Sequence, residues 1–281
     1  FDVPGGDRIT LKTAVTIDNQ AGEITIDFAG SSGRSPRGIN VVPAYTQAYA
    51  TFAIRSTLNP DLPNNAGSLA PIKLKLPENC IVNATYPSPV NARHVVGMYV
   101  PFPILNALAQ VVPDKVVAEG SGAVWTVQIQ GQDEEGRAFT SSMFNYSGGM
   151  GARATKPGIS AVCYPTGVSA VPVEVLEAAY PIVFTCKELE RGSGGKGAQP
   201  GGDGQRIGFR MRTNTPWLIN TVPSRLHEAP QGLHGGAPGR AGQFLINGKS
   251  ASLSGKTDMK AGDEITMITP GGGGFGAFEA A

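Results

Sequence analysis

Glycine limits the folds open to this chain more than any other residue, because it is gathered in a few long runs. The chain of 281 residues contains 38 glycines and 22 prolines. The densest runs fall in residues 147–158, 192–204, 224–242 and 270–276. Glycine weakens helices and strands, and proline lacks the amide hydrogen that both need. Because these runs are longer than ordinary connections, they predict ordered loops that hold a functional site or an interface.

Between the glycine-rich runs, alternation of apolar and polar residues predicts β-structure. Alternating segments occur at residues 8–17, 23–28, 72–76, 125–129, 138–146, 182–189, 207–212, 217–222, 243–246 and 264–268. Helical spacing is limited to residues 43–58, 104–111 and 173–178. The sequence therefore predicts a mainly β protein with a few helices, of the α+β class. Since no repeat period or linker is visible, we expect a single β-rich domain with long glycine-rich loops.

The charge balance limits the kinds of partner that this chain can attract, and the cysteines indicate the compartment in which it functions. Lys and Arg number 23 and Asp and Glu 22, a net charge of +1 that creates no field toward nucleic acid or an anionic membrane. The most apolar stretch, residues 95–112, is interrupted by Pro101, Pro103 and Asn106, which predicts buried structure and not a membrane span. The 3 cysteines form no C-x-x-C pair and suggest no disulfide framework. We expect a cytoplasmic protein with no nucleic-acid or membrane partner.

Two segments look like phosphate-binding loops but lack required residues. Residues 192–197 read GSGGKG, yet Gly197 stands where a Ser or Thr should hold magnesium. Residues 248–250 read GKS, but Gln243 occupies the position of the required glycine. Asn247-Gly248 between two alternating segments is typical of a hairpin turn. The sequence predicts no nucleotide site within this chain.

Side chains that could carry chemistry are few. The 3 histidines, His94, His227 and His234, belong to no ligand-spacing pattern, so no metal site wholly within this chain is predicted. Glu174 and Glu177 lie three apart on the expected short helix, so their carboxylates could share a face, although solvated helical glutamates are the commoner outcome. No G-x-S-x-G motif or other nucleophile pattern is present. Spacing alone therefore names no catalytic residue.

An ordered series of short motifs runs over most of the chain. They are DFAGS at 27–31, PNNAG at 63–67, YSGGMGAR at 146–153, PVEVLE at 172–177, GSGGKG at 192–197, PQGLHGGAPG at 230–239 and TPGGGGFG at 269–276. Their order and spacing resemble the hydantoinase B/oxoprolinase family, which includes the corresponding domain of 5-oxoprolinase and related subunits of acetone and acetophenone carboxylases. The family often has Arg, Gly and Trp where Ala70, Asn79 and Gln231 stand, and Asp-Ser where residues 191–193 read RGS.

The resemblance also implies that part of the family subunit lies outside this chain. Family subunits are longer and carry an H-x-x-D motif and a later histidine, likened to a metal site, in an N-terminal half. Residues 1–281 are then expected to be the C-terminal part of a hydantoinase B-type subunit, forming one domain. The start at Phe1 in place of Met is what a processed, cleaved or truncated chain would show. Any divalent metal is expected in that N-terminal half.

The function implied by the resemblance is ATP-dependent hydrolysis of the C–N bond of a small cyclic amide, as in hydantoinases, N-methylhydantoinases and 5-oxoprolinases. A hydantoinase A-type partner subunit would bind ATP and Mg, and this chain would help to complete the substrate site in a multi-subunit complex. Two alternatives stay open. The same architecture could serve an ATP-dependent ketone carboxylase, or the chain could be a non-catalytic structural fragment of such a complex.

The glycine-rich loops supply the candidate site. Residues 147–153, 192–197 and 234–239 are expected to converge on one region that faces the missing half or a partner, because paired glycines allow close approach and expose N–H groups. Substrate or interface contacts are expected first from Arg153 and His234, and then from Arg225. Glu174 and Glu177 are expected to fix loop geometry. The glycines singled out are Gly148, Gly149, Gly194 and Gly195.

Overall fold

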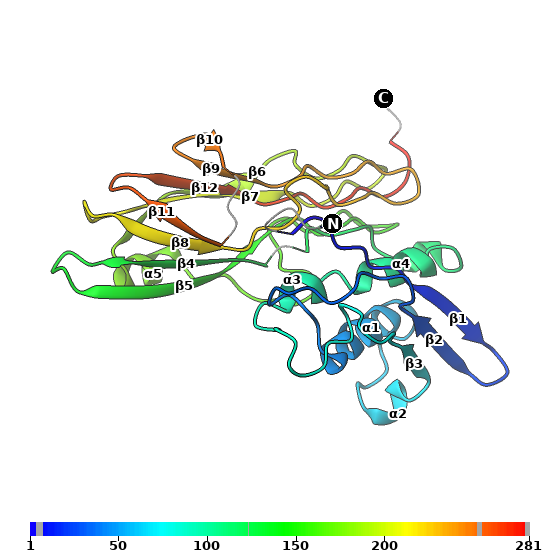
Figure 1. Cartoon of the computed structure of the whole chain (residues 1–281). Coiled ribbons are helices and arrows are strands. Elements are labelled where there is room, and N and C mark those ends of the chain that lie inside the picture. The colour runs from blue at the N-terminus through cyan, green and yellow to red at the C-terminus, as the bar shows by residue number, and fades with distance from the viewer. Residues whose placement is uncertain (4–7, 123, 252–254, 279–281) are drawn as a thin grey trace. The chain divides into compact units, whose positions relative to one another are not determined.

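The chain folds into two compact units that interleave in sequence. A computed structural model describes residues 1–3, 8–122, 124–251 and 255–278 (Figure 1). The first unit comprises Phe1–Arg8 and Ala118–Ala281, and the second comprises Ile9–Val117. With 16% helix and 29% strand, the predicted mainly β, α+β class is confirmed. The glycine-rich loops all belong to the first unit.

The second unit contains a small sheet and most of the helices. Its strands have the order β1-β2-β3, in which β1 pairs antiparallel with β2 and β2 pairs parallel with β3. The strands are β1 (Ala14–Asp18), β2 (Glu23–Asp27) and β3 (Ile72–Lys75). The helices are α1 (Pro43–Leu58), α2 (Ala66–Leu69), α3 (His94–Gly97), α4 (Pro101–Leu108) and the 3₁₀ turn η1 (Pro113–Lys115).

Two predictions in this unit need shifted boundaries. The strand expected over residues 8–17 begins at Ala14, and the helix expected over residues 104–111 is α4, which begins at Pro101. Proline fits the first turn of a helix because the amide hydrogen that it lacks would have no partner there. The apolar stretch is buried as predicted, with Val96, Val100 and Ile104 fully covered. Among helices in the described ranges, none has the length and apolar character that a bilayer crossing requires.

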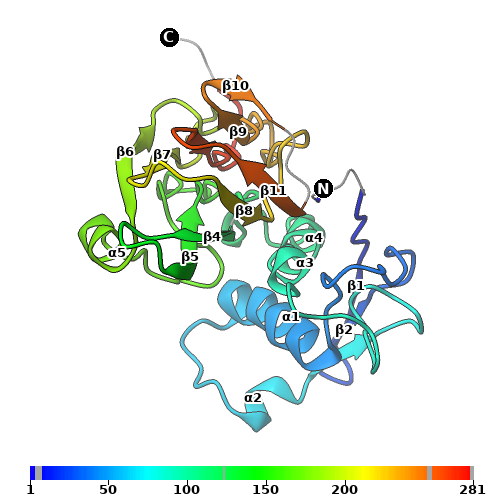
Figure 2. The ribbon, with the colours of Figure 1, turned by 60° about the vertical axis from the view of Figure 1, so that its left-hand side comes forward.

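The first unit is a β-sandwich. One sheet has the order β10-β9-β12-β7-β6 and the other β11-β8-β4-β5, and all neighbouring strands are antiparallel (Figures 1 and 2). The strands are β4 (Val124–Gln132), β5 (Ala138–Ser147), β6 (Ile182–Glu190), β7 (Gly204–Met211), β8 (Trp217–Thr221), β9 (Gln243–Ile246), β10 (Lys249–Ser250), β11 (Gly255–Met259) and β12 (Glu264–Ile268). The helix α5 (Val173–Ala179) packs against β6.

Alternating side chains of both sheets form the core of the sandwich. Trp125 of β4, Phe209 of β7 and Trp217 of β8 belong to one continuous buried cluster. Each large apolar side chain that is fully buried contributes about 1.5–3 kcal/mol relative to exposure. The expected strands of this unit are all present. The sequence missed β10 and β11, since β10 is only two residues long and β11 reads GKTDM, without an apolar alternation.

Candidate functional site

The glycine-rich loops of the first unit lie side by side as extended segments. We call residues 118–121, 148–153, 193–202, 231–239 and 270–276 together the glycine bundle, and their ribbons run next to one another beyond β7 and β12 in Figure 1. Backbone hydrogen bonds join them. Gly195 N donates to Gly272 O at 2.8 Å, and Gly202 N donates to Met150 O at 2.9 Å. The three loops expected to converge therefore do lie in one region.

The central segment of the bundle, Gly271 to Gly274, shows why so many glycines are needed. A Cβ atom added to each of the four in turn would lie only 2.0–2.2 Å from a backbone oxygen, namely that of Ser193, Met150, Gln231 and Lys196. Gly271, Gly272 and Gly273 thus face three different segments, and Gly274 faces the same segment, 193–202, as Gly271 does. A period of three residues is that of a polyproline II helix, which has no internal hydrogen bonds and can donate to its neighbours.

The candidate glycines are structural members of this bundle. Gly149 N donates to Pro270 O at 2.9 Å, and Gly194 N donates to Asp203 Oδ1 at 2.9 Å. Gly195 N is held by Gly272, as described above, and a Cβ on Gly148 would lie 2.4 Å from Ser121 Cβ. The expectation that paired glycines expose their N–H groups is therefore wrong for Gly149, Gly194 and Gly195. The amides of Gly149 and Gly195 donate to other segments of the bundle, whereas the amide of Gly194 donates to the Asp203 side chain at the end of its own loop.

Both apparent phosphate loops have other roles. Residues 192–197 run into the bundle, and residues 198–203 continue as an extended segment and not as a helix. Residues 248–250 belong to the β9–β10 hairpin. Asn247 and Gly248 have φ values of 50° and 73°, as a type I′ turn requires, so the predicted hairpin turn is confirmed.

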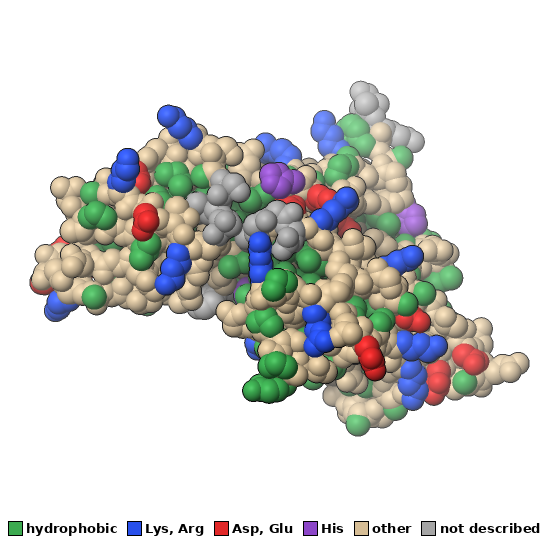
Figure 3. Space-filling model, in the orientation of Figure 1, with side chains coloured by type: hydrophobic (Ala, Val, Ile, Leu, Met, Phe, Trp, Pro, Cys, Tyr) green, Lys and Arg blue, Asp and Glu red, His purple; other side chains and the backbone are tan. Residues whose placement is uncertain are grey.

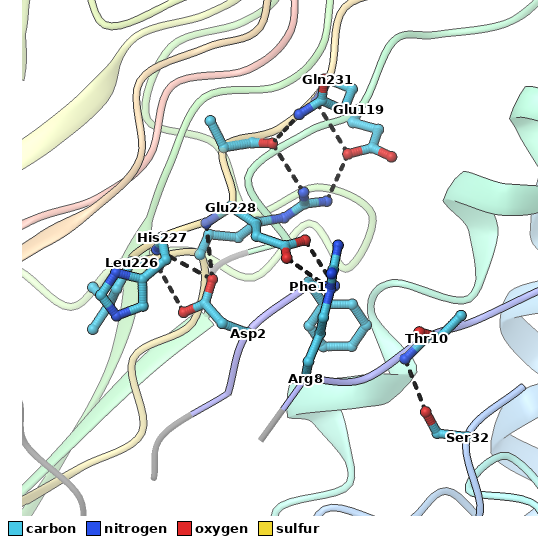
Figure 4. A network of polar contacts seen from close by, with 12 residues as sticks. Phe1, Asp2, Arg8, Thr10, Ser32, Glu119, Leu226, His227, Glu228 and Gln231 are labelled. Carbon is cyan, nitrogen blue, oxygen red and sulfur yellow. Dashed lines mark hydrogen bonds and ion pairs between the residues drawn. The ribbon is translucent and has the colours of Figure 1, made fainter. Parts of the chain in front are cut away.

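Arg225 lies buried beside the bundle. Its Nη2 donates to Glu119 Oε2 at 2.8 Å, and only 6% of the Arg225 side chain and 16% of the Glu119 side chain are exposed. The same Glu119 oxygen accepts from Gln231 N at 3.1 Å, and Arg225 Nη1 donates to Ala229 O at 3.2 Å (Figure 4). The contacts of this guanidinium are thus within the chain. Removing one partner of such a pair would leave a buried charge uncompensated.

The loop that follows Arg225 is fixed by a second carboxylate. Asp2 accepts hydrogen bonds from three consecutive amides, at 3.0 Å from Leu226 N, 3.2 Å from His227 N and 3.0 Å from Glu228 N (Figure 4). Arg8 Nε lies 2.8 Å from Glu228 Oε1. Neither Glu119 nor Asp2 could be found from local patterns, because neither lies in a motif and their partners are more than a hundred residues away.

Arg153 and His234 each follow a residue whose amide is hydrogen-bonded to the central segment of the bundle, and the two acceptors are neighbours in sequence. Ala152 N donates to Gly273 O, and Leu233 N donates to Gly274 O, both at 2.9 Å. The Arg153 side chain is half-buried and its Nη2 donates to Pro157 O at 3.3 Å. His234 is exposed, with its ring edge-on to Phe275 and the centroids 5.2 Å apart. These two candidates therefore share one part of the bundle.

Arg153 also influences the partly buried Tyr164. Burial raises the pKa of Tyr164 to about 12, and the positive charge of Arg153 opposes part of that rise. The remaining candidates lie elsewhere, on α5. Glu174 is exposed, whereas Glu177 Oε1 accepts from Phe184 N of β6 at 2.7 Å. The two glutamates are thus not brought to the bundle.

A cleft of about 410 Å³ lies where the sandwich meets the bundle. Its walls include Glu190 at the end of β6, Arg206 of β7 and Arg240 of the loop before β9. Glu190 Oε2 lies 3.0 Å from Arg206 Nε, and Glu190 Oε1 lies 3.4 Å from Arg240 Nη2. The sequence analysis did not single out these three residues, because no local pattern links them.

One face of the chain carries charged side chains of both signs. On the face shown in Figure 3, the Lys, Arg, Asp and Glu side chains lie scattered and form no continuous patch of one sign. Within the described ranges, no group of three or more His, Cys, Asp or Glu side chains could hold a metal ion.

Fold and site together define a class: a mainly β protein whose long loops form a backbone-packed glycine bundle at the end of a sandwich. The sequence model of the Hydantoinase B/oxoprolinase family matches residues 2–278. The chain belongs to this family, and the resemblance predicted from its motifs is confirmed.

Relatives in several organisms match almost the whole chain. An uncharacterised protein of Methanocaldococcus jannaschii is 32% identical over 96% of this chain and 47% of its own length. The 5-oxoprolinase 1 of Arabidopsis thaliana is 32% identical over 97% of this chain and 21% of its own length. The 5-oxoprolinase of Dictyostelium discoideum is 28% identical over 96% of this chain and 21% of its own length. The chain thus spans about half, or less, of the length of these relatives.

Solved structures share the fold. A nucleotide-free acetone carboxylase superposes with a TM-score of 0.82 at 17% identity, covering 95% of this chain and 41% of that chain. The ATP-dependent caprolactamase of Pseudomonas jessenii superposes with a TM-score of 0.80 at 20% identity, covering 97% and 49%. At these low sequence identities, the comparison shows that the fold is shared.

Proposed function

We propose that this chain is part of an ATP-dependent enzyme that opens a small cyclic amide, of the hydantoinase or 5-oxoprolinase type. The observation that carries the proposal is the match of residues 2–278 to the Hydantoinase B/oxoprolinase family. A relative named 5-oxoprolinase 1 is 32% identical over 97% of the chain, and a solved structure of the same fold is an ATP-dependent caprolactamase. Both of those names denote enzymes of cyclic amides.

The chemistry explains why such an enzyme needs more than this chain. An amide carbonyl is a poor electrophile, and converting its oxygen to a phosphate leaving group makes attack by water feasible in a site that positions the reactants. We assign ATP and Mg to a hydantoinase A-type partner subunit, and any divalent metal to the N-terminal half of the family subunit. Support comes from the 192–197 segment, in which the amides of Ser193, Gly194 and Gly195 already donate to Glu190 O, Asp203 Oδ1 and Gly272 O. The chain's share would be to complete the substrate site.

Reconstitution tests this proposal. The chain would be purified from its native source, every co-purifying chain identified, and ATP hydrolysis measured with a panel of hydantoins, 5-oxoproline, lactams and ketones. We expect ATP hydrolysis coupled to ring opening of one cyclic amide. Turnover of a ketone with bicarbonate would establish the carboxylase alternative, which the fold shared with acetone carboxylase favours. An active complex that keeps full turnover without this chain would show a structural role.

Arg153 and His234 are the side chains that we propose for substrate or interface contacts. Replacing either by alanine in the reconstituted complex should lower turnover at least about tenfold, which corresponds to about 1.4 kcal/mol in the barrier. Matched controls are Arg137→Ala, at an exposed turn of the β4–β5 hairpin, and His227→Ala, which removes another exposed imidazole. Circular dichroism would verify folding. Unchanged turnover in both bundle variants would refute the assignment.

A further inference from the structure

The cleft beside Glu190, Arg206 and Arg240 has the volume of a small-molecule site. Its volume of about 410 Å³ lies in the range of ligand-binding pockets, roughly 300–1,000 Å³. Several stretches of the first unit meet there, among them the end of β6, the beginning of β7, the loop before β9 and the end of β12. The cleft is therefore built by the tertiary fold and not by one flexible loop.

Two arginines share a single carboxylate in this cleft. Each Glu190 oxygen serves one guanidinium, so two guanidinium groups share this one carboxylate. An arginine carries five N–H donors, and the contacts to Glu190 and to the Arg191 carbonyl use only a few of them. Since 35% of the Arg206 side chain and 56% of the Arg240 side chain are exposed, the remaining donors are within reach of an anion.

The chemistry of the walls favours a carboxylate over a phosphate. A carboxylate adds one negative charge beside Glu190, whereas a phosphate dianion adds two, and the repulsion from Glu190 is correspondingly larger. The planar guanidinium fork matches the two oxygens of a carboxylate. Leu226 and Ile268 add apolar surface to the cleft, and the exposed Gln243 adds an amide. These walls suit a ligand with a short, partly apolar body.

We propose that this cleft binds a small-molecule carboxylate through the guanidinium groups of Arg206 and Arg240, with Glu190 as the internal competitor that the ligand displaces in part. The inference goes beyond the proposed reaction and holds whichever reaction the complex performs. The proposal predicts that removing the negative charge of Glu190 tightens the binding of the carboxylate. If the ion pairs of Glu190 were purely structural, removing that charge would not tighten binding.

Ligand-observed NMR with the full chain, in the complex in which it is purified, tests the chemical class. The probes are butyrate, its neutral analogue butyramide and inorganic phosphate, at fixed ionic strength. We expect butyrate to bind at least about tenfold more tightly than butyramide, which corresponds to about 1.4 kcal/mol. Equal binding of butyrate and butyramide, or tighter binding of phosphate than of butyrate, would overturn the proposal.

Substitutions locate the site. Arg206→Gln and Arg240→Gln should each weaken butyrate binding at least about tenfold, and Glu190→Gln should strengthen it severalfold. Arg210→Gln is the matched control, because Arg210 points from the same face of β7 as Arg206 but is not part of the cleft. Arg240 is mostly exposed, so its variant should fold even if the Arg206 variant does not. Weaker binding in Glu190→Gln, or an equal loss in Arg210→Gln, would refute the assignment.

Discussion

Single residues in the glycine bundle are constrained by how closely the neighbouring backbones approach. At Gly149, a Cβ atom would lie 1.8 Å from Gly202 O, a separation that no side chain tolerates. Elsewhere in the chain the constraint is conformational. Asn79 has φ 57°, which glycine adopts without cost and asparagine tolerates better than other residues. This conformation explains how asparagine can stand where the family often has glycine.

Gly149→Ala should therefore destabilise the first unit by about 3 kcal/mol, because the backbone carbonyl in its way cannot move without breaking bundle hydrogen bonds. Gly120→Ala is the control within the same bundle, since its Cβ would meet the nearest atom, Tyr164 Cδ1, at an ordinary 3.5 Å. Its cost should stay below about 1 kcal/mol. Urea denaturation of both variants measures the difference, and equal midpoints would contradict the steric explanation.

At the scale of elements, single side chains connect neighbouring helices and strands. The helix α5 is short and exposes most of its residues, so its own propensity cannot hold it in place. Glu177 links its last turn to β6 through the hydrogen bond from Phe184 N, and its carbonyl accepts from Arg212 Nη1 at 3.2 Å. Glu174, one turn earlier, points to solvent. The expectation that these glutamates fix loop geometry thus has a physical basis at Glu177 alone.

Glu177→Ala should lower the free energy of unfolding by about 1–2 kcal/mol, because the Phe184 amide loses its acceptor in a partly buried place. Glu174→Ala, one turn away on the same helix, should change it by less than about 0.5 kcal/mol. Thermal or chemical unfolding of the pair decides the point. A larger effect at Glu174 would show that the helix is held by contacts of the other glutamate.

At the scale of the whole molecule, the first unit has two sheets and the second has one, and in sequence the second unit is inserted between Arg8 and Ala118 of the first. In the segment that resembles a phosphate loop, the amides of Ser193, Gly194 and Gly195 already donate within the first unit. Histidines, cysteines and carboxylates in the described ranges form no cluster that fits a metal ion. We propose that residues outside this chain bind the nucleotide and any metal.

The chain on its own should bind neither ATP nor a divalent metal tightly. Isothermal titration calorimetry with Mg-ATP should give no micromolar affinity, and elemental analysis after dialysis should find no stoichiometric zinc or manganese. Adding the partner subunit and the N-terminal half should bring nucleotide binding to the complex. Micromolar ATP binding by this chain alone would contradict the assignment of the nucleotide to a partner.

Much of the fold could be read from local patterns, because a strand or a hairpin turn depends on neighbours in sequence. Alternation predicted most strands of the sandwich, the Asn247-Gly248 turn was predicted from two residues, and the motif series identified the family. The sequence also predicted that the glycine-rich loops would meet. It did not predict the period of three in the bundle, since each glycine faces a backbone carbonyl that is remote in sequence.

The residues of the candidate sites depended on the tertiary structure alone. Arg225 meets Glu119 across 106 positions, and Glu190 meets Arg206 and Arg240 only after β6, β7 and the loop before β9 have come together. Which charged side chains pair depends on how segments that are distant in sequence pack together. Such a pair therefore has no characteristic spacing in the sequence. The sequence by itself thus determined the elements and the family. The fold decided which amides, carboxylates and guanidinium groups remain available to a ligand.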